Sequence, residues 1–184
     1  MKVAIICEGV GDKTFLEDFI KHLEIETKPN FYVCGGKSNL LDPTYRKYTE
    51  LKNVVAAEAH KLLFVVDADD MKNDVRYGGF AKTEQALKQV IAALEFETAS
   101  SSYIMCDPTT QIGYLESLIL STISETQKQC IQSFLDCSEF KSKENHKAIL
   151  NSIYNTAYPD APYDFSHSNF DELKNAIIAL FQPT

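Results

Sequence analysis

The sequence has no apolar run long enough to cross a membrane, and the apolar stretch before Glu8 is too short for the core of a signal peptide. We therefore expect a cytoplasmic protein without membrane contact. Paired cysteine motifs are also missing, because the five cysteines are an odd number and none is spaced as Cys-x-x-Cys. This pattern predicts buried or reduced thiols and excludes a disulfide framework.

Histidine and basic residues are few. The chain has four histidines, which lack partner spacing, so we do not expect a zinc site. It has 18 Lys and Arg residues against 26 Asp and Glu residues, which gives a formal net charge of -8. Broad nonspecific binding to nucleic acid depends on neutralising phosphates, and this charge argues against it. The sequence still allows a local cluster of basic residues that binds a polyanion.

The length and composition are those of one globular unit. The chain has 184 residues, 45% of them hydrophobic, and contains no internal repeat or low-complexity stretch. We divide it into an α/β core over residues 1–124 and a helical C-terminal extension over residues 125–184 that packs on the core. A homodimer is compatible with these features.

Residues 62–66 form a run of five apolar residues that leads directly into Asp67, Asp69 and Asp70. A continuous apolar run without alternation is typical of a strand that is covered on both faces in a parallel sheet. Similar runs lie at 3–7, 31–34 and 102–106, and helical periodicity lies between them. The sequence therefore predicts an α/β Rossmannoid fold with a central, mainly parallel sheet of about four strands, flanked by helices.

Acidic residues follow two of the predicted strands. Glu8 follows the first strand, and Asp67 and Asp69 follow the third. Because the carboxyl ends of parallel strands meet at one edge, we expect these carboxylates to lie near one another. Like charges at such distances repel by ~1 kcal/mol per pair in water, and a hard cation would relieve the repulsion. The alternative is a plain acidic turn, because Asp is also a good turn former.

Glycines and a lysine follow two of the predicted strands. Gly9 follows Glu8, and Gly35-Gly36-Lys37 follows the second strand, which predicts a modest anion site of backbone amides and one positive charge. We reject a nucleotide-binding P-loop, because Phe31 stands where that motif needs glycine and because Pro43 is expected to prevent a helix from following directly.

Several of these motifs occur together in a known type of domain. The pattern Glu8-Gly9-x-x-Asp12, followed later by Asp67-x-Asp69 at a strand end, resembles the Toprim domain of topoisomerases, primases and several nucleases. With Gly35-Gly36-Lys37 and Gly113-x-Leu115-Glu116, the chain is similar to a small bacterial group of stand-alone Toprim-like proteins, DUF3226. The resemblance covers most of the chain and is weaker in the helical tail.

The resemblance implies a role for each acid. Glu8 would act as general acid or base, Asp67 and Asp69 would hold Mg²⁺, or Mn²⁺ in its place, and Asp12 and Glu116 would help to complete the metal site. On sequence grounds alone Asp12 also fits a helix N-cap. The implied function is magnesium-dependent phosphodiester cleavage of the nuclease type, or phosphotransfer, on nucleic acid or another phosphate-bearing substrate. The alternative is a non-catalytic metal- or partner-binding module that retains the Toprim fold.

Other readings of the motifs fit less well. A haloacid-dehalogenase-like phosphatase normally has its Asp-x-Asp after the first strand, with threonine where this chain has Met71. A receiver-like module would need its acid pair at the first strand. The chain lacks an ATPase motif and a zinc ribbon, which excludes the large Toprim machines. The aromatic residues of the tail are expected to pack in the core rather than to stack on bases, because basic residues are not interleaved with them; they are Tyr154, Tyr158, Tyr163, Phe165 and Phe170.

Overall fold

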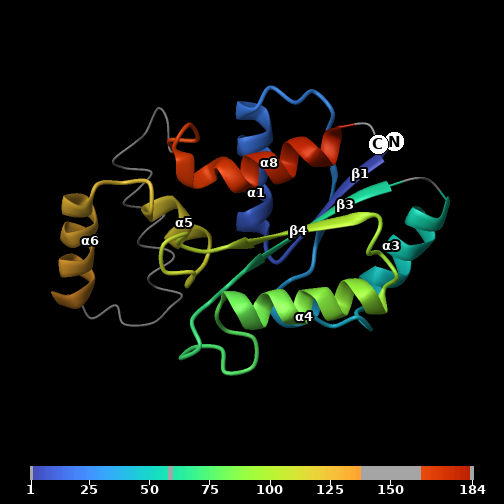
Figure 1. Cartoon of the computed structure of the whole chain (residues 1–184), viewed down its shortest axis with the longest axis horizontal. Helices are drawn as coiled ribbons and strands as arrows, with labels where there is room; N and C mark the ends of the chain where they lie inside the picture. The colour runs from blue at the N-terminus through green and yellow to red at the C-terminus, as the bar shows by residue number, and fades with distance from the viewer. Residues whose placement is uncertain (1, 58–59, 138–162, 183–184) are drawn as a thin grey trace.

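The computed structural model describes residues 2–57, 60–137 and 163–182, and it is built around a four-stranded sheet (Figure 1). The strands are β1 (Lys2–Cys7), β2 (Asn30–Val33), β3 (His60–Asp67) and β4 (Ser100–Met105). All three neighbouring pairs are parallel, in the order β2-β1-β3-β4. The predicted α/β fold with a parallel sheet flanked by helices is confirmed.

Helices lie on both faces of this sheet. Figure 1 shows α1 and α8 on one side and α3 and α4 on the other. The helical elements are α1 (Val10–His22), α2 (Lys37–Leu40), α3 (Arg46–Ala57), α4 (Phe80–Ala93), α5 (Leu115–Leu120), α6 (Glu125–Cys137), the short 3-10 helix η1 (Ser168–Phe170) and α8 (Asp171–Phe181). Within the described ranges, no helix combines the length and the apolar character that a membrane crossing requires. Part of the predicted helical extension, residues 138–162, lies outside the described residues.

Alternation along the strands divides the core into two layers. Ile5 and Leu63 are fully buried on the face that α1, α5 and α8 cover. Their neighbours Ile6 and Phe64 are buried on the opposite face, against α2, α3 and α4. Because successive side chains of a strand point to opposite faces, a strand buried on both sides must be apolar at every position. This explains the uninterrupted apolar runs of β1 and β3.

The C-terminal helix α8 is a full member of one of these layers. Its residues Leu173, Ile177 and Leu180 are buried in the same cluster as Phe19 of α1. These positions are spaced by four and three residues and therefore form one stripe of a helix. The segment predicted as a C-terminal extension thus supplies much of the cover for the β3 and β4 side chains on this face.

Two local expectations from the sequence are wrong. Helix α1 begins at Val10, after Gly9 as N-cap, so Asp12 lies inside the first turn and is not the N-cap. A one-turn helix, α2, begins at Lys37 directly after Gly36, although Pro43 follows. The prediction failed because the four residues of α2 and its C-cap, Leu41, fit before the proline, which restricts only the residue that precedes it.

Candidate functional site

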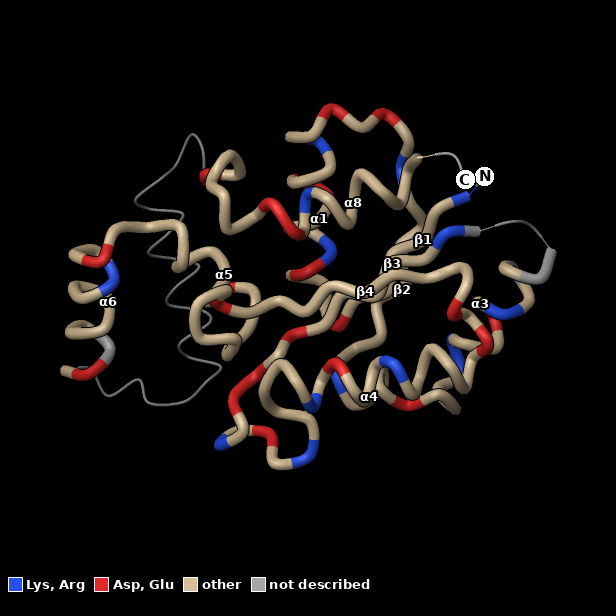
Figure 2. The backbone as a smooth tube through the Cα atoms, viewed as in Figure 1, with Lys and Arg blue, Asp and Glu red and all other residues tan. Residues whose placement is uncertain are grey.

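The strand ends place Glu8 and Asp67 side by side. Strand β1 pairs with β3 in parallel, with Cys7 opposite Val65, so both strands end at the same edge of the sheet. Glu8 follows Cys7, and its Oε1 accepts a hydrogen bond of 2.8 Å from the backbone N–H of Asp67. Figure 2 shows further acidic stretches at this end of the sheet, beside α5 and along the chain that leaves β3.

A cavity of about 800 Å³ opens at this edge. Five carboxylates line it: Glu8 directly after β1, Asp12 and Asp18 in α1, Asp67 at the end of β3 and Glu116 in α5. The other lining residues are Gly9, Gly11, Thr14, Phe15, Gly35, Gly36, Leu115 and Tyr163. We call this space the acid cavity. Among the described residues that line it there is no lysine or arginine.

Backbone amides orient two of these carboxylates. Asp67 Oδ1 accepts a hydrogen bond of 3.1 Å from the N–H of Leu115, in the first turn of α5. Asp12 Oδ2 accepts one of 2.7 Å from the N–H of Gly9 at the start of α1. Helix N-termini have unpaired N–H groups and a positive partial charge, so both acids occupy favourable positions. Each of these hydrogen bonds, like the one that Glu8 accepts from the Asp67 N–H, uses one oxygen of its carboxylate.

Glu116 reaches the cavity because of the turn that precedes α5. Gly113 has φ +103°, a left-handed conformation, and a Cβ atom there would lie 2.1 Å from Ser117 Oγ. Gly113 also pairs with Asp69 in an isolated antiparallel bridge, which ties the start of α5 to the chain leaving β3. Glu116, 6% exposed, thereby lies beside the end of β3. Replacement of this glycine would therefore disturb the acid cavity.

The pKa of Glu8 is raised from 4.5 to about 8. The main cause is burial, which disfavours the charged carboxylate, and the second is the nearby charge of Asp67. The hydrogen bond from the Asp67 N–H acts in the opposite direction but is weaker. A carboxylic acid that keeps its proton near neutral pH can serve as a proton donor.

We predict that Glu8→Gln makes stability less dependent on pH. In the unaltered protein the unfolded chain releases the Glu8 proton near pH 4.5, while the folded chain holds it to about pH 8. Stability from this group is therefore full below pH 4.5 and is lost as the pH rises toward 8. Gln keeps the acceptor for the Asp67 N–H without a charge. Urea unfolding at pH 5.0 and pH 8.5 should show the variant gaining relative to the unaltered protein at the higher pH.

The control for this measurement is Glu50→Gln, which removes an exposed carboxylate from α3. Its stability relative to the unaltered protein should change little between the two pH values. If the difference between Glu8→Gln and the unaltered protein were equal at pH 5.0 and pH 8.5, the raised pKa of Glu8 would be contradicted.

Asp69 lies apart from the acid cavity. It is not among the residues that line the cavity, and its Oδ2 lies 3.4 Å from the ammonium nitrogen of Lys37. The side chains of Asp69 and Lys37 are 8% and 7% exposed, so this is a buried ion pair. From the sequence we expected Asp67 and Asp69 to repel one another. In the structure Asp69 instead has a positive partner inside the protein, Lys37.

Lys37 is buried and joins several segments of the chain by hydrogen bonds, rather than being an exposed cation. Its Nζ donates hydrogen bonds to the carbonyl oxygens of Ala68 (2.9 Å) and Tyr77 (3.3 Å) and to Thr83 Oγ1 (2.9 Å). The carboxylate of Asp74 lies 3.9 Å away. Burial lowers the pKa of Lys37, and nearby acids oppose this. The lysine thus connects α2 to both ends of the loop over residues 70–79.

The glycines of the predicted anion site also direct their amides inward. The N–H groups of Gly35 and Gly36 both donate to the backbone carbonyl of Glu8, at 2.7 and 3.0 Å, and that of Gly9 donates to Asp12. Since the Lys37 ammonium is buried elsewhere, the structure does not combine these donors into an anion site. The two glycines after β2 instead hold the backbone of Glu8 in place.

The comparisons with known proteins identify the family. The model of the family described as "Protein of unknown function (DUF3226)" matches residues 2–161. The chain belongs to the DUF3226 family. No curated protein and no solved structure matches it.

The acid cavity of this DUF3226 protein suits a hard cation by its chemistry. Carboxylate oxygens are the ligands that Mg²⁺ prefers, and Glu8, Asp12, Asp67 and Glu116 all supply them. In the described part of the chain, however, no three His, Cys, Asp or Glu side chains are arranged as a metal-binding group. The donors therefore fit magnesium by type, but their present arrangement is not a closed coordination sphere.

The tail of the DUF3226 chain supplies a cavity residue that the sequence argument missed. Tyr163 lines the acid cavity and also packs against Phe15, with ring centroids 5.4 Å apart. The sequence assigned it to packing alone, and no local motif indicates that residue 163 lies beside the end of β1. Its place depends on α8, which brings the end of the chain back over the sheet.

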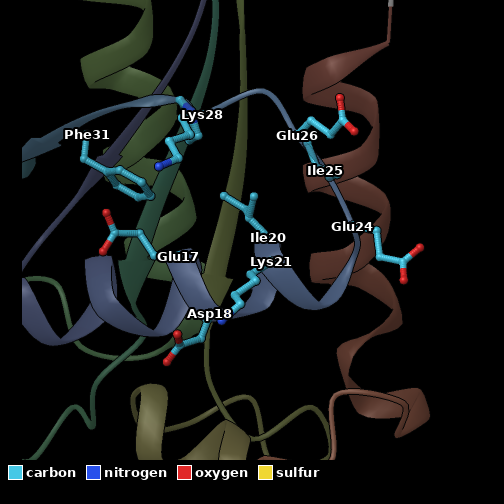
Figure 3. A pocket seen from close by; sticks show the side chains of 10 residues that line it. Glu17, Asp18, Ile20, Lys21, Glu24, Ile25, Glu26, Lys28 and Phe31 are labelled. Carbon is cyan, nitrogen blue, oxygen red and sulfur yellow. The ribbon is translucent and has the colours of Figure 1, made fainter.

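A second hollow, of about 830 Å³, lies between α1 and the segment that leads into β2. Figure 3 shows Ile20 directed toward its middle, with Phe31 on one side and both acidic and basic side chains around it. It contains none of Glu8, Asp12, Asp67 and Glu116, although Asp18 of α1 borders both spaces. We therefore place the candidate active site in the acid cavity.

Proposed function

We propose that this DUF3226 protein is a magnesium-dependent enzyme that cleaves or transfers phosphate esters in the acid cavity. The observation that carries the proposal is the pairing of Glu8, whose pKa is raised to about 8, with Asp67 at one edge of a parallel sheet, among further carboxylates. The similarity of Glu8-Gly9-x-x-Asp12 and Asp67-x-Asp69 to Toprim motifs supports the same reaction class.

Glu8 is the proton donor in this proposal. Its Oε1 accepts the Asp67 N–H, so Oε2 is the oxygen that carries the proton. In the metal-free protein the acid form predominates at neutral pH, because the pKa lies near 8. Transfer of this proton to the departing ester oxygen would prevent the build-up of negative charge on that oxygen as the bond to phosphorus breaks. The glycine amides that hold the Glu8 carbonyl keep this side chain in position.

The ion would be held by Asp67, Asp12 and Glu116. A bound Mg²⁺ would neutralise charge on the phosphate, which is needed here because no basic residue lines the described cavity. The Leu115 N–H orients Asp67 for this role, and the Gly9 N–H orients Asp12. We assign Asp69 to the buried pair with Lys37 rather than to the ion. In this proposal the substrate phosphate completes a coordination sphere that the protein leaves open.

The test is the effect of metal on thermal unfolding, together with turnover. If Mg²⁺ or Mn²⁺ binds only the folded state, a concentration about a hundredfold above its Kd adds ~2.7 kcal/mol and raises the Tm by roughly 5 to 10 °C. Asp67→Asn should lose most of this gain, because an amide replaces a charged ligand. Asp136→Asn, on the exposed side of α6, should keep all of it. Labelled DNA, RNA and nucleotides with each metal provide the assay of turnover.

The outcomes separate the two candidate functions. The lack of basic residues in the described lining also fits a non-catalytic module that binds a cation or a basic partner, since such a module needs no phosphate contact. A metal-dependent rise in Tm without any product would favour that module. If neither metal changes the Tm, with or without phosphate compounds present, the metal site would be contradicted.

A further inference from the structure

The lining of the acid cavity is chemically mixed. Beside the carboxylates it contains Phe15, Leu115 and Tyr163; Tyr163 is half-buried, whereas Phe15 and Leu115 are 2% and 7% exposed, so the exposed apolar surface comes mainly from Tyr163. A phosphate group and one ion fill a small part of about 800 Å³, a volume in the range that holds a whole small organic ligand. The cavity beside Tyr163 therefore has room for the organic part of a phosphate ester.

The Tyr163 ring is held firmly where it meets the cavity. Its centroid lies 5.4 Å from that of Phe15 at an interplanar angle of 75°, and 5.3 Å from that of Phe165 at 41°. Phe165 in turn meets Phe15 edge-on at 5.7 Å. Edge-on and tilted pairs at these distances are favourable arrangements of aromatic rings. Tyr163 itself is half-buried, so part of its surface borders the cavity.

The same cluster extends into the core, which keeps the ring from moving. Phe165 also contacts Phe19 and Phe170, with centroids 4.8 and 5.8 Å apart, and both of these phenylalanines are fully buried. Tyr163 is therefore fixed through two layers of rings before any ligand arrives. A binding surface that is already ordered loses little entropy when a ligand settles on it.

We propose that Tyr163 is a specificity-determining residue that contacts a planar ring carried by the phosphate ester. The inference rests on the proposed function, because the carboxylates of the acid cavity and the ion they bind would hold the phosphate. A flat ring can stack on or meet the edge of the tyrosine, whereas a puckered ring of similar size cannot match this geometry. The site would thus prefer aryl- or base-bearing phosphates over alkyl phosphates.

Phenyl phosphate and cyclohexyl phosphate test this preference, because they share a charge and differ in the planarity of the ring. We expect calorimetric titration with Mg²⁺ or Mn²⁺ present to give the unaltered protein an affinity about twofold to tenfold higher for phenyl phosphate. Tyr163→Leu should bind the two compounds equally, while Tyr163→Phe should keep the preference because it keeps the ring. Phe31→Leu is the matched control, since it removes a half-buried ring of β2 that does not line the acid cavity.

The outcomes separate failure of the role proposed for Tyr163 from failure of the proposed function. Equal binding of the two compounds by the unaltered protein, or a preference that survives in Tyr163→Leu, overturns the role of Tyr163 and leaves the metal site in place. If Phe31→Leu loses the preference together with Tyr163→Leu while both variants stay folded, the preference does not come from contact with Tyr163 and the proposal is overturned. If neither compound binds and the metals leave the Tm unchanged, the proposed function and this inference both fail.

Discussion

Replacing Glu8 by Gln should lower the rate of phosphate ester cleavage by about 10²- to 10⁴-fold, the usual contribution of a positioned proton donor. The amide keeps the size of the side chain and the acceptor for the Asp67 N–H, but it has no proton to give at Oε2. The rise in Tm with Mg²⁺ should be largely kept, because the proposed ligands are unchanged. In the unaltered protein the rate should fall as the pH rises and Glu8 loses its proton.

Steady-state rates for the unaltered protein, Glu8→Gln and Glu50→Gln, purified in the same way, measure this effect. Glu50→Gln changes an exposed carboxylate of α3 and should retain full activity. Equal rates in all three proteins would mean that the turnover comes from a contaminant or that Glu8 takes no part in it. A loss of both the rate and the metal response in Glu8→Gln would instead make Glu8 a ligand of the ion.

The second large effect is expected at Lys37. Lys37→Met should lower the free energy of unfolding by about 3 to 5 kcal/mol, the usual result of removing one partner of a buried ion pair. The methionine fills similar space, but it leaves the Asp69 carboxylate buried without its ammonium. It also removes the donor to the carbonyl oxygens of Ala68 and Tyr77, which lie at the two ends of the loop over residues 70–79.

Urea unfolding measures this loss, and Lys82→Met is the control. Lys82 is exposed and donates to one carbonyl of the same loop, so its replacement should change stability by about 0.5 kcal/mol or less. The double variant Lys37→Met with Asp69→Asn should recover part of the loss, because the uncompensated charge is removed as well. An unfolding midpoint for Lys37→Met equal to that of Lys82→Met would show that the buried pair contributes nothing.

The parts of the fold that depend on local patterns were predictable from the sequence. The continuous apolar run of residues 62–66 identified β3 as a strand buried on both faces, and the alternation of strands and helices identified the parallel sheet. The placement of Glu8 and Asp67 at one edge follows from those two facts, because parallel strands end on the same side. For the site, the sequence therefore predicted only what the backbone topology determines, which is the position of Glu8 and Asp67 at one edge of the sheet.

The directions of individual side chains were not predictable in this way. Asp69 has φ +59°, and its side chain pairs with a lysine that the sequence assigned to an anion site. Nothing in the pattern Gly35-Gly36-Lys37 shows that the ammonium is buried against the loop over residues 70–79. Tyr163 was missed for a different reason, because its contact with Phe15 joins distant parts of the chain and has no periodic signal.

The position of α8 also has a consequence for how the protein folds as it is synthesised. Strand β3 leaves the ribosome long before α8, yet the face that carries Leu63 and Val65 is covered partly by Leu173 and Ile177 of that helix. That layer of the core cannot close during most of translation. Contacts between such distant segments slow folding, and exposed apolar strands favour aggregation. The nascent chain should therefore depend on chaperone protection until α8 has emerged.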